Sequence, residues 1–173
     1  MPSQRAIRKL PRVNFGDKIV TRENLPAWRS ALRARGEKLV VTNGCFDLLH
    51  AGHVTYLESA RNLGDALLVG VNGDEATRQL KGPGRPVNSE ADRSAVLAAL
   101  QSVDGVCVFG ENTATRFLAA AQPDVYVKGG DYTLETLNQD ERRAVELAGG
   151  KIVIIPFVPG KSTTVILEKI SRL

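Results

Sequence analysis

The sequence predicts a single α/β domain in which helices cover both faces of a five-stranded parallel sheet. From residue 38 onward, short runs of β-branched residues alternate with longer stretches of helical periodicity. Several of these runs are apolar without alternation, which is typical of parallel strands buried on both faces. Strand–helix alternation of this kind favours right-handed crossovers, and together these observations predict a sheet of Rossmann-like type.

Strands are expected at residues 39–42, 66–71, 105–109, 124–127 and 151–155. Helices are expected between them, at 52–63, 74–80, 90–101, 113–121 and 139–148, with a last one from 162 to the end. Ser89 and Thr113 are suitable N-cap residues for the third and fourth of these helices. Gly149 and Gly150 are expected to end the fifth, because glycine commonly follows the last helical residue.

The first 37 residues precede this alternation. Residues 1–17 are expected to form a basic N-terminal arm and 18–173 the functional domain, in which 18–37 carry a leading helix and 38–173 form the α/β core. The leading helix is expected over residues 21–35, where apolar side chains recur at helical spacing. Trp28 belongs to this set, so it is interpreted as an anchor that faces the core.

The composition is that of an ordinary globular protein, with 173 residues of which 43% are hydrophobic and 24% charged. No apolar stretch approaches the length of a membrane span, and the basic N-terminus lacks the apolar segment of a secretory signal. We therefore expect a cytoplasmic protein with no membrane partner. Two cysteines and two histidines offer too few ligands for a metal centre, so no metal-binding residue is predicted. The net charge of +4 lies largely in the first 12 residues and aromatics are few, which argues against a nucleic-acid partner.

The strongest functional signal is the segment from Thr42 to His53, which follows the first strand and enters a helix. His50 and His53 are three residues apart, so both imidazoles point the same way from a helical turn. Gly52 lets a ligand approach the backbone, and the helix start adds free N–H donors at the positive end of its dipole. The segment predicts a site for triphosphate oxygens. The alternative is one capping histidine and one satisfied core histidine.

Three further segments carry groups that suit phosphates or hydroxyls. Pro159–Thr164 opens the last helix, where hydroxyls and backbone N–H groups suit phosphate oxygens, although an ordinary serine cap is the alternative. Lys81–Pro86, with Arg93 on the next helix, suits an incoming phosphomonoester, or else is a solvated surface turn. Lys128–Tyr132 follows the fourth strand and is either a glycine turn or part of the pocket, with Asp131 as acceptor for a hydroxyl or base.

The string GCFDLLHAGH resembles the signature of the HxGH nucleotidyltransferase superfamily. The wider series is TNGCFDLLHAGHV, VNGDE, LKGPGRPVN, ADR, VDGV, PDVYVKGGDY and PGKSTT, and it is similar to the adenylyltransferase domain of bacterial ADP-heptose synthesis over residues 18–172. The resemblance implies transfer of AMP from ATP to D-glycero-β-D-manno-heptose 1-phosphate, with Mg²⁺ accompanying ATP. It also implies a homodimer and, because bifunctional members carry a sugar kinase ahead of this domain, a separate kinase in the pathway.

The resemblance and the segments described above together assign expected roles to individual residues. The catalytic set is His50, His53 and Lys81, in which the histidines bind and polarise the nucleotide phosphates. The nucleotide-binding set is Thr42, Asn43, Gly44, Phe46, Gly52, Lys128, Gly129, Asp131, Ser162, Thr163 and Thr164. The set that binds the second substrate is Asp47, Asn72, Arg85, Arg93 and Tyr132.

Two departures from the family pattern affect the choice of substrates. Cytidylyltransferases that act on alcohol phosphates carry an arginine where this chain has Phe157, which argues against CTP. Residues 133–148 are strongly charged where the family is rich in valine, which leaves the sugar open. The alternative enzyme is a cytidylyl- or adenylyltransferase with another acceptor, such as an alcohol phosphate, pantetheine phosphate or a mononucleotide. The alternative outside catalysis is a nucleotide- or RNA-binding module.

Overall fold

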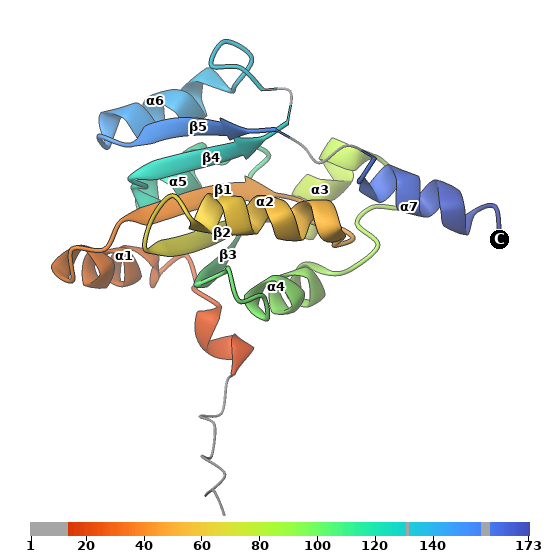
Figure 1. Ribbon diagram of the computed structural model, residues 1–173, viewed down its shortest axis with the longest axis horizontal. Helices are drawn as coiled ribbons and strands as arrows, with labels where there is room; N and C mark the ends of the chain where they lie inside the picture. Colours follow the sequence, from red (N-terminus) through yellow and green to blue (C-terminus); the bar gives the residue numbers. More distant parts are fainter. Residues whose placement is uncertain (1–13, 131, 157–159) are drawn as a thin grey trace, which may run out of the picture.

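The computed structural model describes residues 14–130, 132–156 and 160–173, in which helices lie on both sides of a parallel sheet (Figure 1). The strands are β1 (Leu39–Gly44), β2 (Ala66–Asn72), β3 (Gly105–Phe109), β4 (Val125–Gly129) and β5 (Lys151–Ile155). All pairs are parallel and the order across the sheet is β3-β2-β1-β4-β5. The direction of winding reverses between β1 and β4, so the topological switch point lies there. The predicted fold class is confirmed.

The helices are α1 (Leu25–Ala34), α2 (Ala51–Arg61), α3 (Asp74–Lys81), α4 (Glu90–Ala98), α5 (Thr115–Ala121), α6 (Gln139–Leu147) and α7 (Thr163–Ile170), after a short 3-10 helix, η1 (Phe15–Lys18). α1 begins at residue 25 rather than 21 because Pro26 occupies its first turn, where the missing N–H costs no hydrogen bond. Within the described residues, no helix is both long and apolar enough to cross a membrane.

Each face of the sheet has its own apolar core. On one face, α1, α5 and α6 contribute Leu25, Phe117 and Val145. On the other face, α2 and α4 contribute Leu57 and Leu97. Successive strand residues point to opposite faces, and helices cover both faces, so β2 is buried along its whole length. This explains why its sequence is apolar without alternation.

The interpretation of Trp28 as an anchor that faces the core is confirmed. Trp28 is partly buried against the first core, where a Cβ on Gly105 would lie 3.1 Å from its ring. Cys107 lies fully buried in β3, and this burial raises the pKa of its thiol to about 11. The thiol therefore stays protonated at neutral pH and acts as a small apolar side chain.

Of the two predicted N-cap residues, one is confirmed and the other is not. Ser89 caps α4 by accepting the Asp92 N–H. The prediction that Thr113 caps α5 is wrong, because the cap position belongs to Ala114. Its N–H donates 2.8 Å to Oε1 of Glu141 on α6, so a side chain 27 residues away does the work of the local cap.

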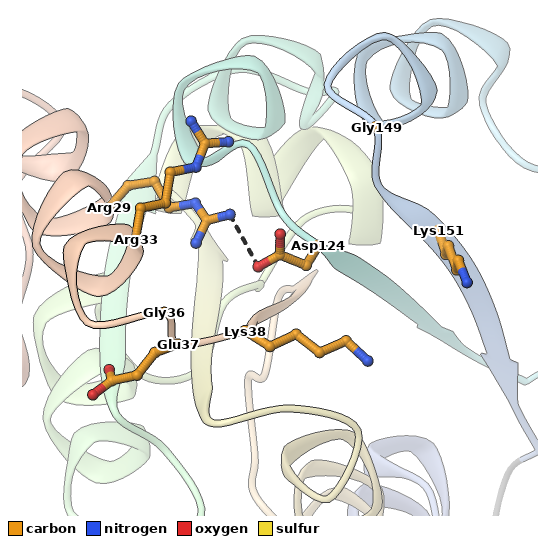
Figure 2. A pocket seen from close by; sticks show the side chains of 8 residues that line it. All are labelled: Arg29, Arg33, Gly36, Glu37, Lys38, Asp124, Gly149 and Lys151. Carbon is orange, nitrogen blue, oxygen red and sulfur yellow. Dashed lines mark hydrogen bonds and ion pairs between the residues drawn. The ribbon is translucent and has the colours of Figure 1, made fainter.

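At the amino ends of the strands, the Asp124 carboxylate joins α1, β1 and β4 (Figure 2). Its Oδ2 accepts from Arg29 Nη2 at 3.0 Å and from the Leu39 N–H at 2.6 Å. Arg29 is 3% exposed, and its Nε donates to the Gln122 carbonyl at 3.0 Å. Arg29 and Asp124 line a hollow of about 460 Å³ at the amino ends of the strands. The contacts fix where β1 and β4 begin relative to each other.

The boundary at residue 18 between the basic arm and the domain stays a prediction, and residues 1–13 lie outside the described residues. Lys18 donates to the carbonyls of Leu100 and Val103 at 3.0 and 2.7 Å. Ile19 forms a parallel bridge with Val106 of β3. The chain is therefore already in contact with the domain at residue 18.

Candidate active site

A cavity of about 1000 Å³ opens at the carboxyl ends of β1 and β4, which is where open α/β sheets bind ligands. Its walls come from the segments that follow β1, β2 and β4, from the end of α3 and from the start of α7. The predicted site residues that line it are Asn43, Gly44, Phe46, Asp47, His50, Gly52, His53, Asn72, Lys81, Arg85, Lys128, Gly129, Tyr132, Ser162, Thr163 and Thr164. Residues far apart in the sequence thus meet in one place.

Two predicted ligand contacts lie behind the wall of the cavity. Thr42 is fully buried, and its hydroxyl is 2.6 Å from the Tyr56 hydroxyl. Arg93 is 2% exposed and all its nitrogens bond to protein groups. Both residues shape the site in this structure instead of lining it. Asp131 and Phe157 lie outside the described residues.

The two histidines lie face to face at the start of α2. Their ring centroids are 3.9 Å apart and the ring planes differ by 20°. His50 occupies the N-cap position, but its side chain makes no capping hydrogen bond. Neither Nδ1 atom has a hydrogen-bond partner among the described residues. This geometry does not match the alternative of one capping and one satisfied core histidine.

Both imidazoles are neutral at neutral pH. Burial, reinforced by the neighbouring His50, lowers the pKa of His53 to about 4. Burial also lowers the pKa of His50, with the charge of Lys161 as the second cause. A neutral imidazole carries one N–H donor and one acceptor nitrogen. Each ring therefore has one proton to donate to a ligand oxygen.

The depressed pKa of His53 predicts that the free energy of unfolding falls as the pH drops from about 6.5 towards 4. In this range the unfolded chain binds a proton at His53 that the folded protein does not, so protonation favours unfolding. Between pH 7 and pH 5 the loss from this one group is at most about 2 kcal/mol. Urea unfolding at a series of pH values measures it.

The matched variant for this prediction is His53→Gln, which removes the titrating group and keeps a polar side chain. Its stability should fall less steeply over the same pH range. Equal slopes for the two proteins would mean that His53 is not buried in its neutral form.

The loop after β1 is shaped to hold the histidines against the start of α7. Phe46 has a φ of 47°, in the left-handed region, and its ring centroid lies 5.3 Å from that of His53. A Cβ on Gly52 would lie 3.0 Å from both His50 Nδ1 and Lys161 Cβ. Glycine at position 52 therefore permits the close approach of the two segments.

The start of α7 supplies the second predicted phosphate-binding segment. Ser162 caps this helix, because its Oγ accepts the Val165 N–H at 3.2 Å. The Thr163 hydroxyl donates to the Leu48 carbonyl at 3.3 Å and so joins the helix to the histidine loop. Ser162 is an N-cap and also lines the cavity, so the two interpretations of this segment are compatible.

Asp47 organises the cationic loop between α3 and α4. Its carboxylate is 6% exposed and accepts from the Arg85 guanidinium. It also accepts the N–H groups of Val87 and Asn88 at 2.7 and 3.3 Å. Because these donors occupy its oxygens, Asp47 positions Arg85 at the cavity more than it offers an acceptor to a ligand.

Arg93 ties together the segments that carry the site. Its Nη1 donates to the Cys45 carbonyl, and its Nε donates to the Asn88 carbonyl at 3.1 Å. Its Nη2 donates to the Asn72 carbonyl and to Asp74 Oδ1, both at 2.8 Å. One buried guanidinium thus links the ends of β1 and β2 to the starts of α3 and α4.

A buried polar network forms the wall beside β4. Asn43 Oδ1 lies 2.7 Å from the Tyr126 hydroxyl and 3.0 Å from Lys128 Nζ. Glu141 Oε2 lies 2.8 Å from the same hydroxyl and 3.5 Å from the same ammonium group. Glu141 is 5% exposed and also lines the cavity.

Sequence reasoning missed Glu141 and Tyr56. Glu141 lies in the first turn of α6, where an acidic residue is ordinary because it complements the helix dipole. Tyr56 lies on α2 and donates to the Val127 carbonyl at 3.1 Å. The only sign of either residue in the sequence is a polar side chain at a helix position that the apolar pattern assigns to the core-facing side.

The described residues contain no group of three or more histidine, cysteine or acidic side chains that could hold a metal ion. The expectation that the protein supplies no metal ligand stays a prediction. Mg²⁺ is commonly held by substrate phosphates with few protein ligands. A magnesium ion that enters with a triphosphate is compatible with this donor set.

Comparison with known proteins gives consistent matches. Residues 41–169 match the model of the family described as Cytidylyltransferase-like. Bifunctional protein HldE from Trichlorobacter lovleyi is 51% identical over 153 residues, which are 88% of this chain and 31% of that protein. Bifunctional protein HldE from Vibrio cholerae serotype O1 is 54% identical over 138 residues, which are 80% of this chain and 29% of that protein. The chain therefore spans about a third of the length of these curated relatives.

Two solved structures share the fold. The lipopolysaccharide core biosynthesis protein from Thermoplasma volcanium superposes with a TM-score of 0.59 at 27% identity, over 71% of this chain and 98% of that one. Pantoate-beta-alanine ligase from Francisella tularensis superposes with a TM-score of 0.58 over 90% of this chain and 78% of that one. At 14% identity, the second match shows the fold alone.

Proposed function

This chain belongs to the cytidylyltransferase-like family and is a nucleotidyltransferase, and we propose that it transfers AMP from ATP to a sugar 1-phosphate. The observation that carries the proposal is the meeting of the two predicted phosphate-binding segments and four cationic side chains in one cavity. These cations are Lys81, Arg85, Lys128 and Lys161. The cavity volume is at the upper end of the ~300–1,000 Å³ that small-molecule sites occupy, which leaves room for two phosphorylated substrates.

The proposed acceptor is D-glycero-β-D-manno-heptose 1-phosphate. It is supported by the motif series from Lys81 onward and by the identity of about half with the HldE proteins. The Thermoplasma volcanium neighbour, at 27% identity, is named for lipopolysaccharide core biosynthesis. A kinase that phosphorylates the sugar is the reaction class that must supply this substrate. A cytoplasmic location, a homodimer and a separate kinase stay predictions.

The proposed reaction is an in-line displacement. An oxygen of the sugar phosphate attacks the α-phosphorus of ATP, a new P–O bond forms, and the bond to the bridging oxygen breaks so that pyrophosphate leaves. The second pKa of a phosphomonoester is near ~6, so its dianion needs no general base at neutral pH. Neutral His50 and His53 act as donors to the phosphate oxygens, and Mg²⁺ enters with ATP as part of the substrate. Catalysis then depends on alignment and on neutralisation of developing charge.

The proposal predicts that the protein, supplied with ATP and Mg²⁺, releases pyrophosphate only when a heptose 1-phosphate is also present. A coupled pyrophosphate assay with ATP and CTP, over a panel of phosphorylated acceptors, measures this directly. The panel contains heptose 1-phosphates, an alcohol phosphate, pantetheine phosphate and a mononucleotide.

The arms of this assay separate the alternatives. Release with CTP but not ATP would reverse the base assignment, and release with another acceptor would keep the reaction and overturn the sugar. No release with any pair, despite ATP binding, would favour a nucleotide-binding module.

A further inference from the structure

We propose that Glu141 is a positioning residue that holds the Lys128 ammonium and the Asn43 amide in place for the nucleotide. Glu141 lies in the charged 133–148 segment that departs from the family pattern, and its side chain points into the wall of the cavity. The inference rests on the proposed function, because it takes Lys128 and Asn43 to contact the phosphates of ATP.

The Glu141 carboxylate is held from three elements. It is carried by α6, its Oε1 accepts the Ala114 N–H at the start of α5, and its Oε2 faces Tyr126 and Lys128 on β4. A buried carboxylate is costly unless charged or hydrogen-bonding groups surround it. This one therefore has a fixed position from which it can act on its neighbours.

The Tyr126 hydroxyl faces two acceptor oxygens but can donate a hydrogen bond to only one of them. The Tyr126 hydroxyl lies within hydrogen-bond distance of both Asn43 Oδ1 and Glu141 Oε2, but it has one proton to donate. Lys128 has three protons and lies close to the same two oxygens. The second acceptor is therefore satisfied by Lys128, and a charged ammonium group donates more strongly than a neutral amine.

The Lys128 ammonium also decides which way the Asn43 amide faces. An ammonium group only donates, so the atom 3.0 Å from Lys128 Nζ must be the amide oxygen. The Nδ2 of Asn43, which lines the cavity, is then left as a donor for a ligand. If Lys128 lost its charge, the site would lose a cation. The Asn43 amide would also lose the ammonium group that fixes its orientation.

Glu141 is the group that keeps this ammonium charged. Burial lowers the pKa of Lys128, and Glu141 opposes that effect by its charge and by a hydrogen bond. The other titratable side chains that face Lys128 among the described residues are Tyr126, Tyr132 and Cys45. Burial and the adjacent Glu141 raise the pKa of Tyr126 well above its usual value, so it stays neutral.

The test is the variant Glu141→Gln, which keeps the shape and a carbonyl acceptor but loses the charge. We expect the alkaline limb of kcat/KM, and of ATP affinity, to move to lower pH by about 1–3 units. The Lys128 ammonium should show the same shift in an NMR titration of protein labelled at lysine Cε, with its signal assigned by Lys128→Arg. The control is Glu146→Gln on the same helix, whose exposed carboxylate pairs with Arg142 and which should move neither quantity.

A second variant tests the idea without a change at position 141. Lys128→Arg carries a guanidinium that does not deprotonate, so its alkaline limb should disappear. The inference is overturned if Lys128→Arg keeps that limb, or if folded Glu141→Gln keeps both the wild-type profile and the wild-type lysine titration. The NMR and ATP-binding measurements need no acceptor, so they test Glu141 even if wild-type protein releases no pyrophosphate, which would count against the proposed function alone.

Discussion

The variant His53→Ala is expected to lower kcat by roughly 10²–10³-fold and to leave the affinity for ATP nearly unchanged. The histidine pair is neutral, so it does not attract the triphosphate by charge. Its contribution is an N–H that becomes a stronger donor as negative charge gathers on the α-phosphate and the leaving pyrophosphate. An interaction made mainly in the transition state affects turnover more than binding.

Pre-steady-state turnover and equilibrium ATP binding, measured on the same preparation, separate the two effects. The stacked rings and the contact between Phe46 and His53 make local repacking a concern. His53→Gln is therefore the matched variant, because its side-chain amide fills the space and restores one N–H donor. Gln at position 53 should recover part of the rate. Equal losses of turnover and ATP affinity in His53→Ala would show that the histidine binds the ground state.

The variant Arg93→Met is expected to lower the free energy of unfolding by about 3–5 kcal/mol. Methionine fills much of the volume but cannot donate. The carbonyls of Cys45, Asn72 and Asn88 would then lose their buried charged donor, and Asp74 would lose its ion-pair partner. Unsatisfied buried carbonyls carry their full desolvation cost. The same change should raise KM for the phosphorylated acceptor, because the loops that line the cavity would no longer be tied together.

Urea unfolding and steady-state kinetics at a temperature where the variant is folded measure the two parts of this prediction. Arg78→Met is the control, since Arg78 is an exposed residue of α3 that pairs with Glu75 on the surface. Its effect should be below about 0.5 kcal/mol. If Arg93→Met lowered the free energy of unfolding no more than Arg78→Met does, the hydrogen bonds of Arg93 would not stabilise the fold as proposed.

The fold was predictable because its signals are local. The apolar run of β2 and the cap residue Ser89 each lie within the element that they define. The exceptions arise where a distant residue replaces a local one. Thr113 has a side chain suited to capping, but Glu141 reaches the start of α5 from another helix. No sequence window contains both partners.

The residues that line the cavity were largely predictable, and the residues that support them were much less so. His50, His53 and Ser162 carry motif signals and line the cavity. Arg93 was expected to touch substrate, because a cation beside a glycine-rich loop looks the same whether it faces a ligand or lies beneath it. The left-handed backbone of Phe46 was also invisible, since nothing in a phenylalanine indicates a positive φ.

The Asp124 contacts at the amino edge have a consequence at the far end of the sheet. By accepting the Leu39 N–H, Asp124 sets the alignment that places Val40 beside Val125 and Thr42 beside Val127. The next residues along the two strands are Asn43 and Lys128. A slip of one position would displace one of them by about 3.3 Å and turn its side chain to the opposite face. The spacing between these two side chains, which we propose contact the phosphates of ATP, is thus set by a carboxylate that lies outside the cavity, at the opposite ends of the strands.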